Sequence, residues 1–358
     1  MSTDAAYMQR ALDLAARGRG RTSPNPMVGC VVVRNGCTIG EGYHEKAGLP
    51  HAEVNALRSV GDARGATVYV SLEPCCHHGR TPPCVDLLIE RRLARVVVAM
   101  EDPNPLVRGQ GIRKLREAGI VVDVGMLEDD ARRLNEFFVK FITTGRPFVI
   151  AKCAMSLDGK IATRQGDSRW VTAEAARRRV HQLRDAVDVI MVGSGTILSD
   201  DPSLTTRLED RRGKDPIRLI VDDGSRLDTS RRVFRLDSEA PTWVAVPEGH
   251  DFSGADRTLH IAPGPFGLDL KALMSQLGRE ELTSVLIEGG GTTLAAAFEA
   301  GIVDKLMFFV APKIVGGRDA PTPVEGDGVS EMSAALPLRD LRAEPIGEDI
   351  LLEAYVEH

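Results

Sequence analysis

The first part of the chain carries a helical and then a strand-like pattern of apolar side chains. From Asp4 to Arg17 apolar residues recur every three or four positions, which is typical of an amphipathic helix. Asp4 is a suitable N-cap for this helix and Gly18 a suitable stop. The segment MVGCVVVRNGCTIGEGYH then holds two strand-like runs separated by Asn35-Gly36, which is a strong signal for a β-hairpin.

Helical and strand-like segments alternate from there to residue 142. The predicted order is a helix over 51–60, the strand TVYVSLE, a helix over 83–91, the strand RVVVAM, a helix over 110–118, the strand IVVDV and a helix over 127–142. Strands that alternate with helices of this length indicate βαβ units. The first part of the chain is therefore predicted to be an α/β domain.

A polar segment with Gly and Pro, 143–147, separates this region from a new apolar strand, FVIAKCAMS. Further strands are expected at VDVIMVGSGT, PIRLIVDD, TWVAV, SVLIEGGG and KLMFFVAPKIVGG. The chain has 358 residues, which is long for one ordinary domain and comfortable for two. We expect two α/β domains, residues 1–145 and 146–358.

Composition and charge mainly argue against several classes of protein. A net charge of −6 and an aromatic content of 4 % disfavour a nucleic-acid-binding surface. No run of about twenty apolar residues predicts a membrane span, and the polar N-terminus lacks a signal-peptide pattern. Six unevenly spaced cysteines do not form a disulfide framework and fit a reducing, cytoplasmic setting. Cys30, Cys37 and Cys153 are expected to be small core residues.

The chemistry of the first domain is concentrated in residues 51–84, HAEVNALRSVGDARGATVYVSLEPCCHHGRTPPC. His51, Cys75 and Cys84 offer one imidazole and two thiolates, a donor set that suits zinc and leaves a fourth place for water. Glu53, two residues after His51, is placed to move protons. This pattern resembles the zinc-deaminase signature H-x-E…P-C-x-x-C, in which His and two Cys bind the metal and Glu is the proton shuttle.

Two alternatives apply to this site. A structural zinc site would need a fourth protein ligand, and Cys76, His77 and His78 lie close in the sequence. Cys76 also competes with Cys75 as the ligating thiol, although the position after Pro74 favours Cys75. The catalytic interpretation is preferred because the HAE and PC segments stand in the helix–strand–helix context of the deaminases.

The spacing of the two cysteines narrows the resemblance. Eight residues, CHHGRTPP, separate Cys75 from Cys84 where the general signature has two. This insertion is similar to that of the bifunctional pyrimidine deaminase/reductases of riboflavin biosynthesis. The upstream segment TSPNPMVGC resembles the substrate-pocket loop of the same family, with Asn25 as a substrate-binding candidate. The resemblance implies a cytidine-deaminase-like α/β/α fold for the first domain.

In the second domain, the strand SVLIEGGG leads through a glycine turn into a helix of small residues. Free N–H groups at such a helix start can bind phosphate, but the pattern is not a dinucleotide fingerprint, and a plain tight turn explains it equally well. The segments AKCAMSLDGKIAT, GDSRWVT, RDAVDVIMVGSGTILSDDPSLTTR, EGGGTTL and DKLMFFVAPKIVGG nevertheless resemble the reductase half of the same family, in the same order. That half is similar to dihydrofolate reductase in fold and uses NADPH.

The resemblance also carries site residues over by position. The cofactor side comprises Ala154, Trp170, Thr196, Asp200, Asp223, Gly290, Gly291, Thr292, Thr293, Leu294, Ala295 and Ala296. The substrate side comprises Ser168, Arg184, Leu204, Arg207 and Glu288. Guanidinium forks suit phosphate, so we expect Arg184 and Arg207 to bind it. Lys152 and Asp200 are candidates for proton transfer, and a surface lysine and a helix-capping aspartate are equally good explanations.

The sequence therefore predicts a bifunctional enzyme of riboflavin biosynthesis. The zinc domain would deaminate a phosphorylated diaminopyrimidine, and the NADPH domain would reduce its ribosyl group to a ribityl chain. The expected partner is this small molecule, with neither nucleic acid nor membrane, and a homo-oligomer is compatible with the sequence. The alternatives are a nucleic-acid base deaminase, a zinc-stabilised scaffold, and a deaminase whose reductase half has degenerated.

Overall fold

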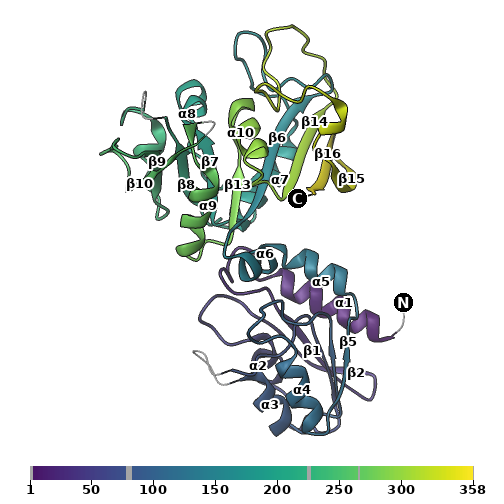
Figure 1. Cartoon of the computed structure of the whole chain (residues 1–358). Helices are drawn as coiled ribbons and strands as arrows, with labels where there is room; N and C mark the ends of the chain where they lie inside the picture. Colours follow the sequence, from purple (N-terminus) through teal and green to yellow (C-terminus); the bar gives the residue numbers. More distant parts are fainter. Residues whose placement is uncertain (1–2, 78–82, 224–226, 265–266, 358) are drawn as a thin grey trace. The chain divides into compact units, whose positions relative to one another are not determined.

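The computed structural model describes residues 3–77, 83–223, 227–264 and 267–357. The chain divides into two compact units, Met1–Gly145 and Arg146–His358 (Figure 1). Each is a mixed α/β unit built around its own sheet.

The N-terminal unit has a five-stranded sheet in the order β2-β1-β3-β4-β5. Its strands are β1 (Gly29–Arg34), β2 (Cys37–Tyr43), β3 (Thr67–Val70), β4 (Arg95–Val98) and β5 (Val121–Val124). β1 is antiparallel to β2 and β3, whereas β3, β4 and β5 are parallel. The predicted hairpin is confirmed, since Asn35 and Gly36 both have positive φ, as the tight turn between β1 and β2 requires.

Helices cover both faces of this sheet. They are α1 (Thr3–Ala16), α2 (Ala52–Leu57), α3 (Cys84–Glu90), α4 (Gln110–Glu117), α5 (Glu128–Leu134) and α6 (Glu136–Thr144). Side chains of α2, α3 and α4 pack with one set of alternating strand residues, and those of α1 and α5 with the other set. This arrangement fixes the starts of α2 and α3 beside the end of β3.

Three details of the prediction are wrong. The helix expected over 127–142 is two helices that meet at Asn135, because the Asn135 amide hydrogen-bonds the backbone N–H and C=O of Met27 at 2.8 and 2.9 Å. Asp4 lies inside α1 and accepts from the Tyr69 hydroxyl and Arg95 instead of acting as the N-cap. Cys37 is exposed on β2, whereas Cys30 and Cys153 are buried as expected.

The C-terminal unit contains a nine-stranded sheet in the order β10-β9-β8-β7-β13-β6-β14-β16-β15. These strands are β6 (Phe148–Ser156), β7 (Val189–Gly193), β8 (Ile217–Val221), β9 (Thr242–Pro247), β10 (Arg257–Ile261), β13 (Ser284–Ile287), β14 (Lys305–Ala311), β15 (Leu338–Ile346) and β16 (Asp349–Val356). The pairs from β10 to β14 are parallel, and β16 and β15 add antiparallel strands. The two-residue strands β11 (Pro263–Gly264) and β12 (Gly267–Leu268) pair separately.

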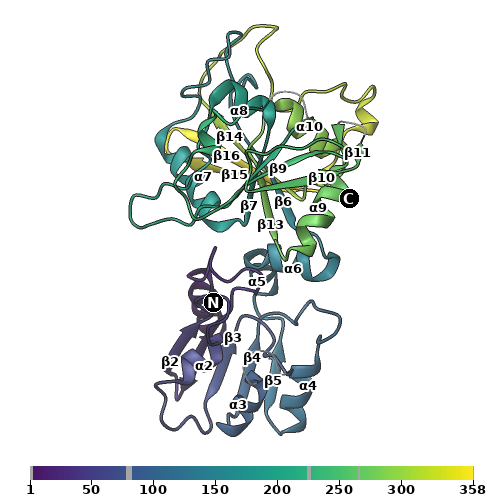
Figure 2. The same cartoon turned by 90° about the vertical axis from the view of Figure 1, so that its left-hand side faces the viewer.

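The helices that flank this sheet are α7 (Glu174–Ala186), α8 (Ser194–Asp200), α9 (Leu270–Arg279) and α10 (Gly291–Glu299), with 3₁₀ turns η1 (Arg232–Phe234) and η2 (Met332–Ala334). Figure 2 shows α9 and α10 on one side of the sheet and α7 and α8 on the other. The apolar clusters agree, because α9 and α10 contribute to one core and α8 to another. The parallel strands therefore carry helices on both faces, as buried parallel sheets do.

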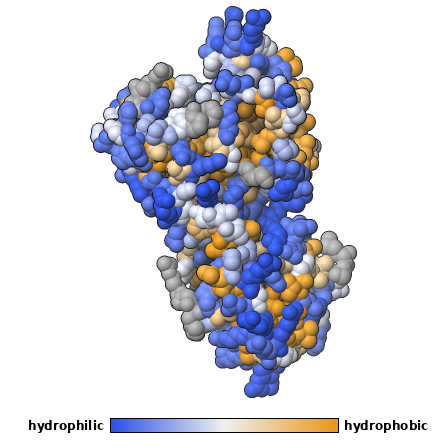
Figure 3. Space-filling model, viewed as in Figure 1, coloured by the Kyte–Doolittle hydropathy of each residue, from blue (hydrophilic) through white to orange (hydrophobic). Residues whose placement is uncertain are grey.

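The face of the molecule shown in Figure 3 is mostly hydrophilic, with hydrophobic residues in separate groups. Among the residues that the structure describes, none of the helices is both long enough and apolar enough to span a bilayer.

Candidate functional site

The strand β3 and the starts of two helices bring His51, Cys75 and Cys84 together. His51 is the N-cap of α2, Cys84 is the first residue of α3, and Cys75 follows the end of β3. The Nδ1 atom of His51 lies 3.3 Å from Cys84 Sγ and 3.5 Å from Cys75 Sγ. All three ligand atoms lie within 4.8 Å of one another. One nitrogen and two sulphurs at this separation fit zinc and leave a coordination place open.

The electrostatics of the cluster favour a cation. Glu53 is buried next to it, and burial together with the charge of Cys75 raises the pKa of this carboxyl to about 7. The pKa of the Cys75 thiol is lowered to about 4, chiefly because Cys84 and His51 hydrogen-bond to the thiolate. The same contact, with burial, raises the pKa of Cys84. A bound Zn²⁺ relieves this competition for protons because it needs both sulphurs as thiolates.

A structural zinc site would need Cys76, His77 or His78 as a fourth ligand. Cys76 does not join the cluster, and its Sγ lies 4.0 Å from the Gln110 side-chain oxygen. His77 is likewise outside the cluster, and His78 lies outside the described residues. Within the described parts of the chain, the three ligands have no fourth His, Cys, Asp or Glu ligand grouped with them. The geometry favours a site with an open position over a closed structural one.

Glu73 fixes the loop that carries Cys75. Its Oε2 accepts backbone N–H groups of Asp102 and Gly109 at 3.1 and 2.9 Å, and its Oε1 accepts those of Gly111 and Ile112 at 2.8 and 3.2 Å. One buried carboxylate thus joins the end of β3 to the loop after β4 and to the start of α4. Four N–H donors satisfy both oxygens of an ionised carboxylate.

Asn25 is linked to the zinc-ligand cluster by contacts of His44. Its Nδ2 lies 3.3 Å from His44 Nε2, and His44 Nδ1 lies 3.2 Å from the carbonyl oxygen of Pro50, which precedes His51. The rings of His44 and His51 pack edge to face with their centroids 5.5 Å apart. His44 was not singled out from the sequence, because one histidine in a strand-end segment carries no pattern of its own.

The C-terminal unit has a cavity of about 710 Å³ beside β6, β13 and α7. The sequence-predicted residues that line it are Ala154, Ser168, Trp170, Arg184, Thr196, Asp200, Arg207, Glu288 and Gly290. A neighbouring cavity of about 720 Å³ is lined by Thr196, Asp223, Gly290, Gly291, Thr292, Thr293, Ala295 and Ala296. Thr196 and Gly290 line both cavities, so the two cavities are neighbours and share part of their wall near the ends of β7 and β13.

Two of the carried-over residues differ from the rest. Leu204 and Leu294 are buried in the apolar cores and are absent from both cavity linings. Any contact of these two residues with a ligand would be made through their backbone.

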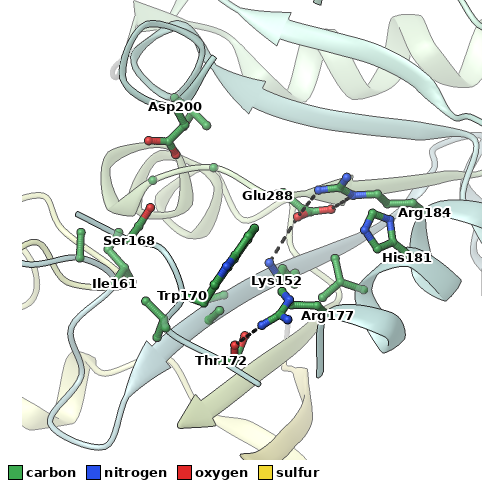
Figure 4. Close-up of a pocket in the computed structure, with 18 of the residues that line it drawn as sticks. Lys152, Ile161, Ser168, Trp170, Thr172, Arg177, His181, Arg184, Asp200 and Glu288 are labelled. Atoms are coloured by element: carbon green, nitrogen blue, oxygen red, sulfur yellow. Dashed lines mark hydrogen bonds and ion pairs between the residues drawn. The ribbon is translucent and has the colours of Figure 1, made fainter. Parts of the chain in front are cut away.

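An ion-pair cluster centred on Glu288 forms the charged part of the first cavity (Figure 4). Arg184 Nε and Nη2 donate to the two carboxylate oxygens at 2.7 and 3.1 Å, and Lys152 Nζ donates at 3.3 Å. Burial acts to raise the pKa of Glu288, but Arg184 and Lys152 overcome it and lower this pKa to about 2. The Arg184 fork is therefore engaged by Glu288, and the binding of a phosphate by Arg184 stays a prediction.

The structure does not favour the alternative explanations of Lys152 as a surface lysine and of Asp200 as a helix cap. The Lys152 side chain is 15 % exposed and paired, so it is not an ordinary surface lysine. Asp200 is the last residue of α8, where a carboxylate does not cap the helix dipole favourably. Both residues line the first cavity.

Trp170 enters the first cavity from a loop, and Arg177 supports it. The Arg177 guanidinium lies 4.7 Å from the centre of the Trp170 ring and donates to the Thr172 carbonyl at 2.7 Å. Arg177 and His181 both lie on α7 and face the cavity, as Figure 4 shows. Neither residue was singled out from the sequence, because the segment of α7 is rich in basic residues and carries no chemical motif.

Comparison with known proteins identifies both units. Residues 1–100 match the family model for the cytidine and deoxycytidylate deaminase zinc-binding region, and residues 147–352 match that for the RibD C-terminal domain. The riboflavin biosynthesis protein RibD of Actinobacillus pleuropneumoniae is 45 % identical, over 99 % of this chain and 96 % of that protein. The RibD protein of Escherichia coli K12 is 42 % identical, over 98 % of each chain.

Solved structures agree over the whole length. RibD of Acinetobacter baumannii superposes with a TM-score of 0.89 at 39 % identity, covering 99 % of each chain. The diaminohydroxyphosphoribosylaminopyrimidine deaminase/5-amino-6-(5-phosphoribosylamino)uracil reductase of Thermotoga maritima superposes with a TM-score of 0.87 at 37 % identity, again over 99 % of each chain.

Proposed function

The chain belongs to the RibD family, a bifunctional deaminase/reductase of riboflavin biosynthesis, and from this premise we propose which residues perform each reaction. The N-terminal unit hydrolyses the amino group of 2,5-diamino-6-(5-phosphoribosylamino)pyrimidin-4-one and releases ammonia. The C-terminal unit then uses NADPH to reduce the ribosyl group, giving 5-amino-6-(5-phosphoribitylamino)uracil. The phosphorylated pyrimidine is the substrate of both units.

The deaminase step depends on His51, Cys75 and Cys84 as zinc ligands. Zinc, when bound, activates water for attack on the ring carbon near neutral pH. The Glu53 carboxylate accepts a proton as the attack begins and returns one to the amino group, which can then leave as ammonia. Asn25, whose Nδ2 lies 3.3 Å from His44 Nε2, hydrogen-bonds the pyrimidine or ribose of the substrate.

The reductase step depends on the two cavities of the C-terminal unit. The nicotinamide cofactor supplies the hydride when bound, and the stretch from Gly290 to Ala296 supports its placement in the second cavity. Glu288 stays anionic and can accept hydrogen bonds from substrate hydroxyl or ring N–H groups. Lys152 and Asp200 line the substrate cavity and are the two candidates for supplying the proton that the reduced sugar needs.

The observation that carries the proposal is the buried Glu53 beside a cluster of three zinc-type ligands with an open coordination place. We would compare wild type with Glu53→Gln and Gly290→Val. Gly290 has φ −70° and ψ 175°, which any residue adopts, and an added Cβ would meet only Thr196 Oγ1 at 4.0 Å. The Cβ of a valine there is therefore accommodated, and we expect its methyl groups to occupy cavity space.

Ammonia release is measured without NADPH, and NADPH oxidation is measured on substrate that is already deaminated. Glu53→Gln should lose about 10²- to 10⁴-fold in ammonia release and keep NADPH oxidation. Gly290→Val should show the reverse. Loss of both activities in both variants, or no ammonia from zinc-loaded wild type, would contradict the assignment.

The remaining expectations rest on composition alone. A cytoplasmic location and the absence of nucleic-acid and membrane partners fit the acidic charge and the low aromatic content. A homo-oligomer stays a prediction that sedimentation of the purified protein would test.

A further inference from the structure

The loop that carries Trp170 is held by cationic side chains from other parts of the C-terminal unit. The Trp170 indole lines the first cavity and is 63 % exposed, so packing in the core does not fix it. Lys313 Nζ donates to the carbonyl oxygens of Trp170 and Val171 at 2.7 and 2.9 Å. Arg177 donates to the next carbonyl, that of Thr172, at 2.7 Å. Three successive carbonyl groups therefore accept hydrogen bonds from two cations.

The contacts of Lys313 restrain the direction in which the indole points. The Trp170 carbonyl belongs to the planar peptide group that begins at the Trp170 Cα atom, so holding this carbonyl limits the ψ angle of Trp170. The bond from Cα to Cβ then has a restricted direction. Arg177 acts on the ring itself, because its guanidinium lies 4.7 Å from the ring centre (Figure 4). Lys313 thus restrains the backbone and Arg177 the ring.

A flexible lysine can restrain another loop only if its own backbone is fixed. The segment after β14 meets this condition, because it is hydrogen-bonded to the loop after β6. The Leu157 N–H donates to the Lys313 carbonyl at 2.9 Å. The Asp158 carboxylate accepts the N–H groups of Val315 and Gly316 at 3.1 and 2.7 Å. The backbone of Lys313 is therefore tied to one loop while its ammonium group holds another.

Neither proposed reaction uses the segment that carries Lys313. This residue follows β14 within KLMFFVAPKIVGG. Lys313 lines neither of the two cavities, whereas Trp170 lines the first. Any effect of Lys313 on a ligand in these cavities therefore passes through the loop of Trp170.

We propose that Lys313 is a positioning residue of the reductase, which holds the loop of Trp170 so that the indole contacts the nicotinamide cofactor. The identity of the ligand rests on the proposed function, and the place of Trp170 on the cofactor side rests on the family resemblance. In this role Lys313 takes no part in hydride or proton transfer. It acts on the affinity for NADPH.

The first test follows tryptophan fluorescence in a Trp243→Phe background, which leaves Trp170 as the sole tryptophan. Lys313→Met removes the ammonium group and keeps the bulk, whereas Lys313→Arg can still donate to two carbonyl oxygens. In cofactor-free protein, the fluorescence anisotropy of Trp170 should fall in Lys313→Met and stay at the level of the background protein in Lys313→Arg. Equal anisotropy in all three proteins would overturn the proposal.

The second test measures NADPH binding by quenching of the same fluorescence, together with reductase kinetics on the deaminated substrate. The Kd and the KM for NADPH should rise about three- to tenfold in Lys313→Met, the range expected for the net loss of one hydrogen bond. The KM for the deaminated substrate should stay close to that of the background protein, and Lys313→Arg should restore most of the NADPH affinity. An equal rise of KM for cofactor and substrate would indicate a general structural role and contradict the proposal.

Lys160→Met is the matched control. Lys160 Nζ donates to the carbonyl oxygen of Ala320 at 3.1 Å, so this variant also loses a lysine–carbonyl hydrogen bond between the loop after β6 and the segment after β14. That contact does not involve the loop of Trp170. The anisotropy of Trp170 and the KM for NADPH should therefore stay near those of the background protein. Changes as large as those of Lys313→Met would refute a specific role of Lys313.

The anisotropy of the cofactor-free protein does not depend on turnover and separates this inference from the proposed function. If wild type fails to oxidise NADPH but the Lys313 variants change the anisotropy as stated, the proposed function is wrong and the restraint of Trp170 by Lys313 stands. If wild type reduces the substrate and Lys313→Met binds NADPH as tightly as the background protein, the proposed function stands and the inference fails.

Discussion

The zinc cluster and the reductase cavity gather their residues in opposite ways. The cluster takes all its ligands and its proton shuttle from residues 51–84, and two helix starts and one strand end fix their positions. The cavity draws on side chains from Lys152 to Pro321, which lie on separate strands, helices and loops. The residues of a site that lies in one stretch can be predicted from their spacing in the sequence. The contacts of a site whose residues come from distant segments depend on the fold and cannot be predicted in this way.

The two regions also differ in how their charges are balanced. Around the cluster, Glu53, Cys75 and Cys84 shift one another's pKa, and their negative charges can be balanced by a bound cation. In the cavity, Glu288 is already neutralised by Lys152 and Arg184. We therefore expect the first region to be complete only with its metal and the ion pairs of the second to be complete without a ligand.

The largest expected effect follows removal of zinc. Dialysis against a strong chelator should abolish ammonia release, because the three ligands then have no cation to hold. NADPH oxidation on deaminated substrate should persist, since the zinc-type ligands found among the described residues all belong to the N-terminal unit. Both activities are measured before and after zinc is added back, with metal content as the control. A loss of NADPH oxidation on chelation would show that the two regions are not independent.

The next effect concerns the charge balance of the cavity. Glu288→Gln leaves Lys152 and Arg184 buried without their anion, which should cost roughly 3–5 kcal/mol of unfolding free energy. The exposed pair of Arg257 and Glu280 offers a matched control, and Glu280→Gln should change the unfolding free energy far less, because solvent screens an exposed ion pair. Both tryptophans, Trp170 and Trp243, belong to the C-terminal unit, so their fluorescence reports its urea unfolding. Equal losses in the two variants would mean that Glu288 is not a buried counter-ion.

Acid should weaken the same cluster in a defined range. The pKa of Glu288 is lowered to about 2 from an ordinary value of 4.5, so its contribution is complete above about pH 4.5 and is lost as the pH falls through about 2. The difference corresponds to roughly 3 kcal/mol. The unfolding free energy, measured by tryptophan fluorescence, should therefore fall more steeply from pH 5 to pH 2 in wild type than in Glu288→Gln. Parallel curves for the two proteins would assign the acid sensitivity to other groups.

The sequence predicted most of the N-terminal unit because its signals are local. The Asn35-Gly36 turn, the alternation of strands and helices, and the ligand spacing each depend on neighbours in the chain. It failed at Asn135, where the break between α5 and α6 is caused by a contact with Met27, far away in the sequence.

In the C-terminal unit most of the parallel strands were predicted, but β10, α7, α8, α9 and the hairpin of β15 and β16 were not. The resemblance to the family named most of the residues that line the two cavities, yet it could not reveal that Arg184 is engaged by Glu288 or that His181 faces Arg207. Those facts are distances between side chains, and they depend on how β13, α7 and the segment after α8 pack.

The smallest expected effect tests whether the local site is also self-sufficient. Glu73 lies within the 51–84 stretch, but its four N–H partners belong to the loop after β4 and to α4. Glu73→Gln keeps the shape and turns one acceptor into a donor, so two of these N–H groups lose their partner, at about 1–3 kcal/mol. The loop of Cys75 should loosen, and zinc affinity should fall about tenfold, as measured by competition with a chelating dye. Glu128→Gln, at an exposed glutamate of α5, is the matched control and should bind zinc as wild type does. Unchanged zinc affinity in Glu73→Gln would mean that residues 51–84 alone determine the geometry of the cluster.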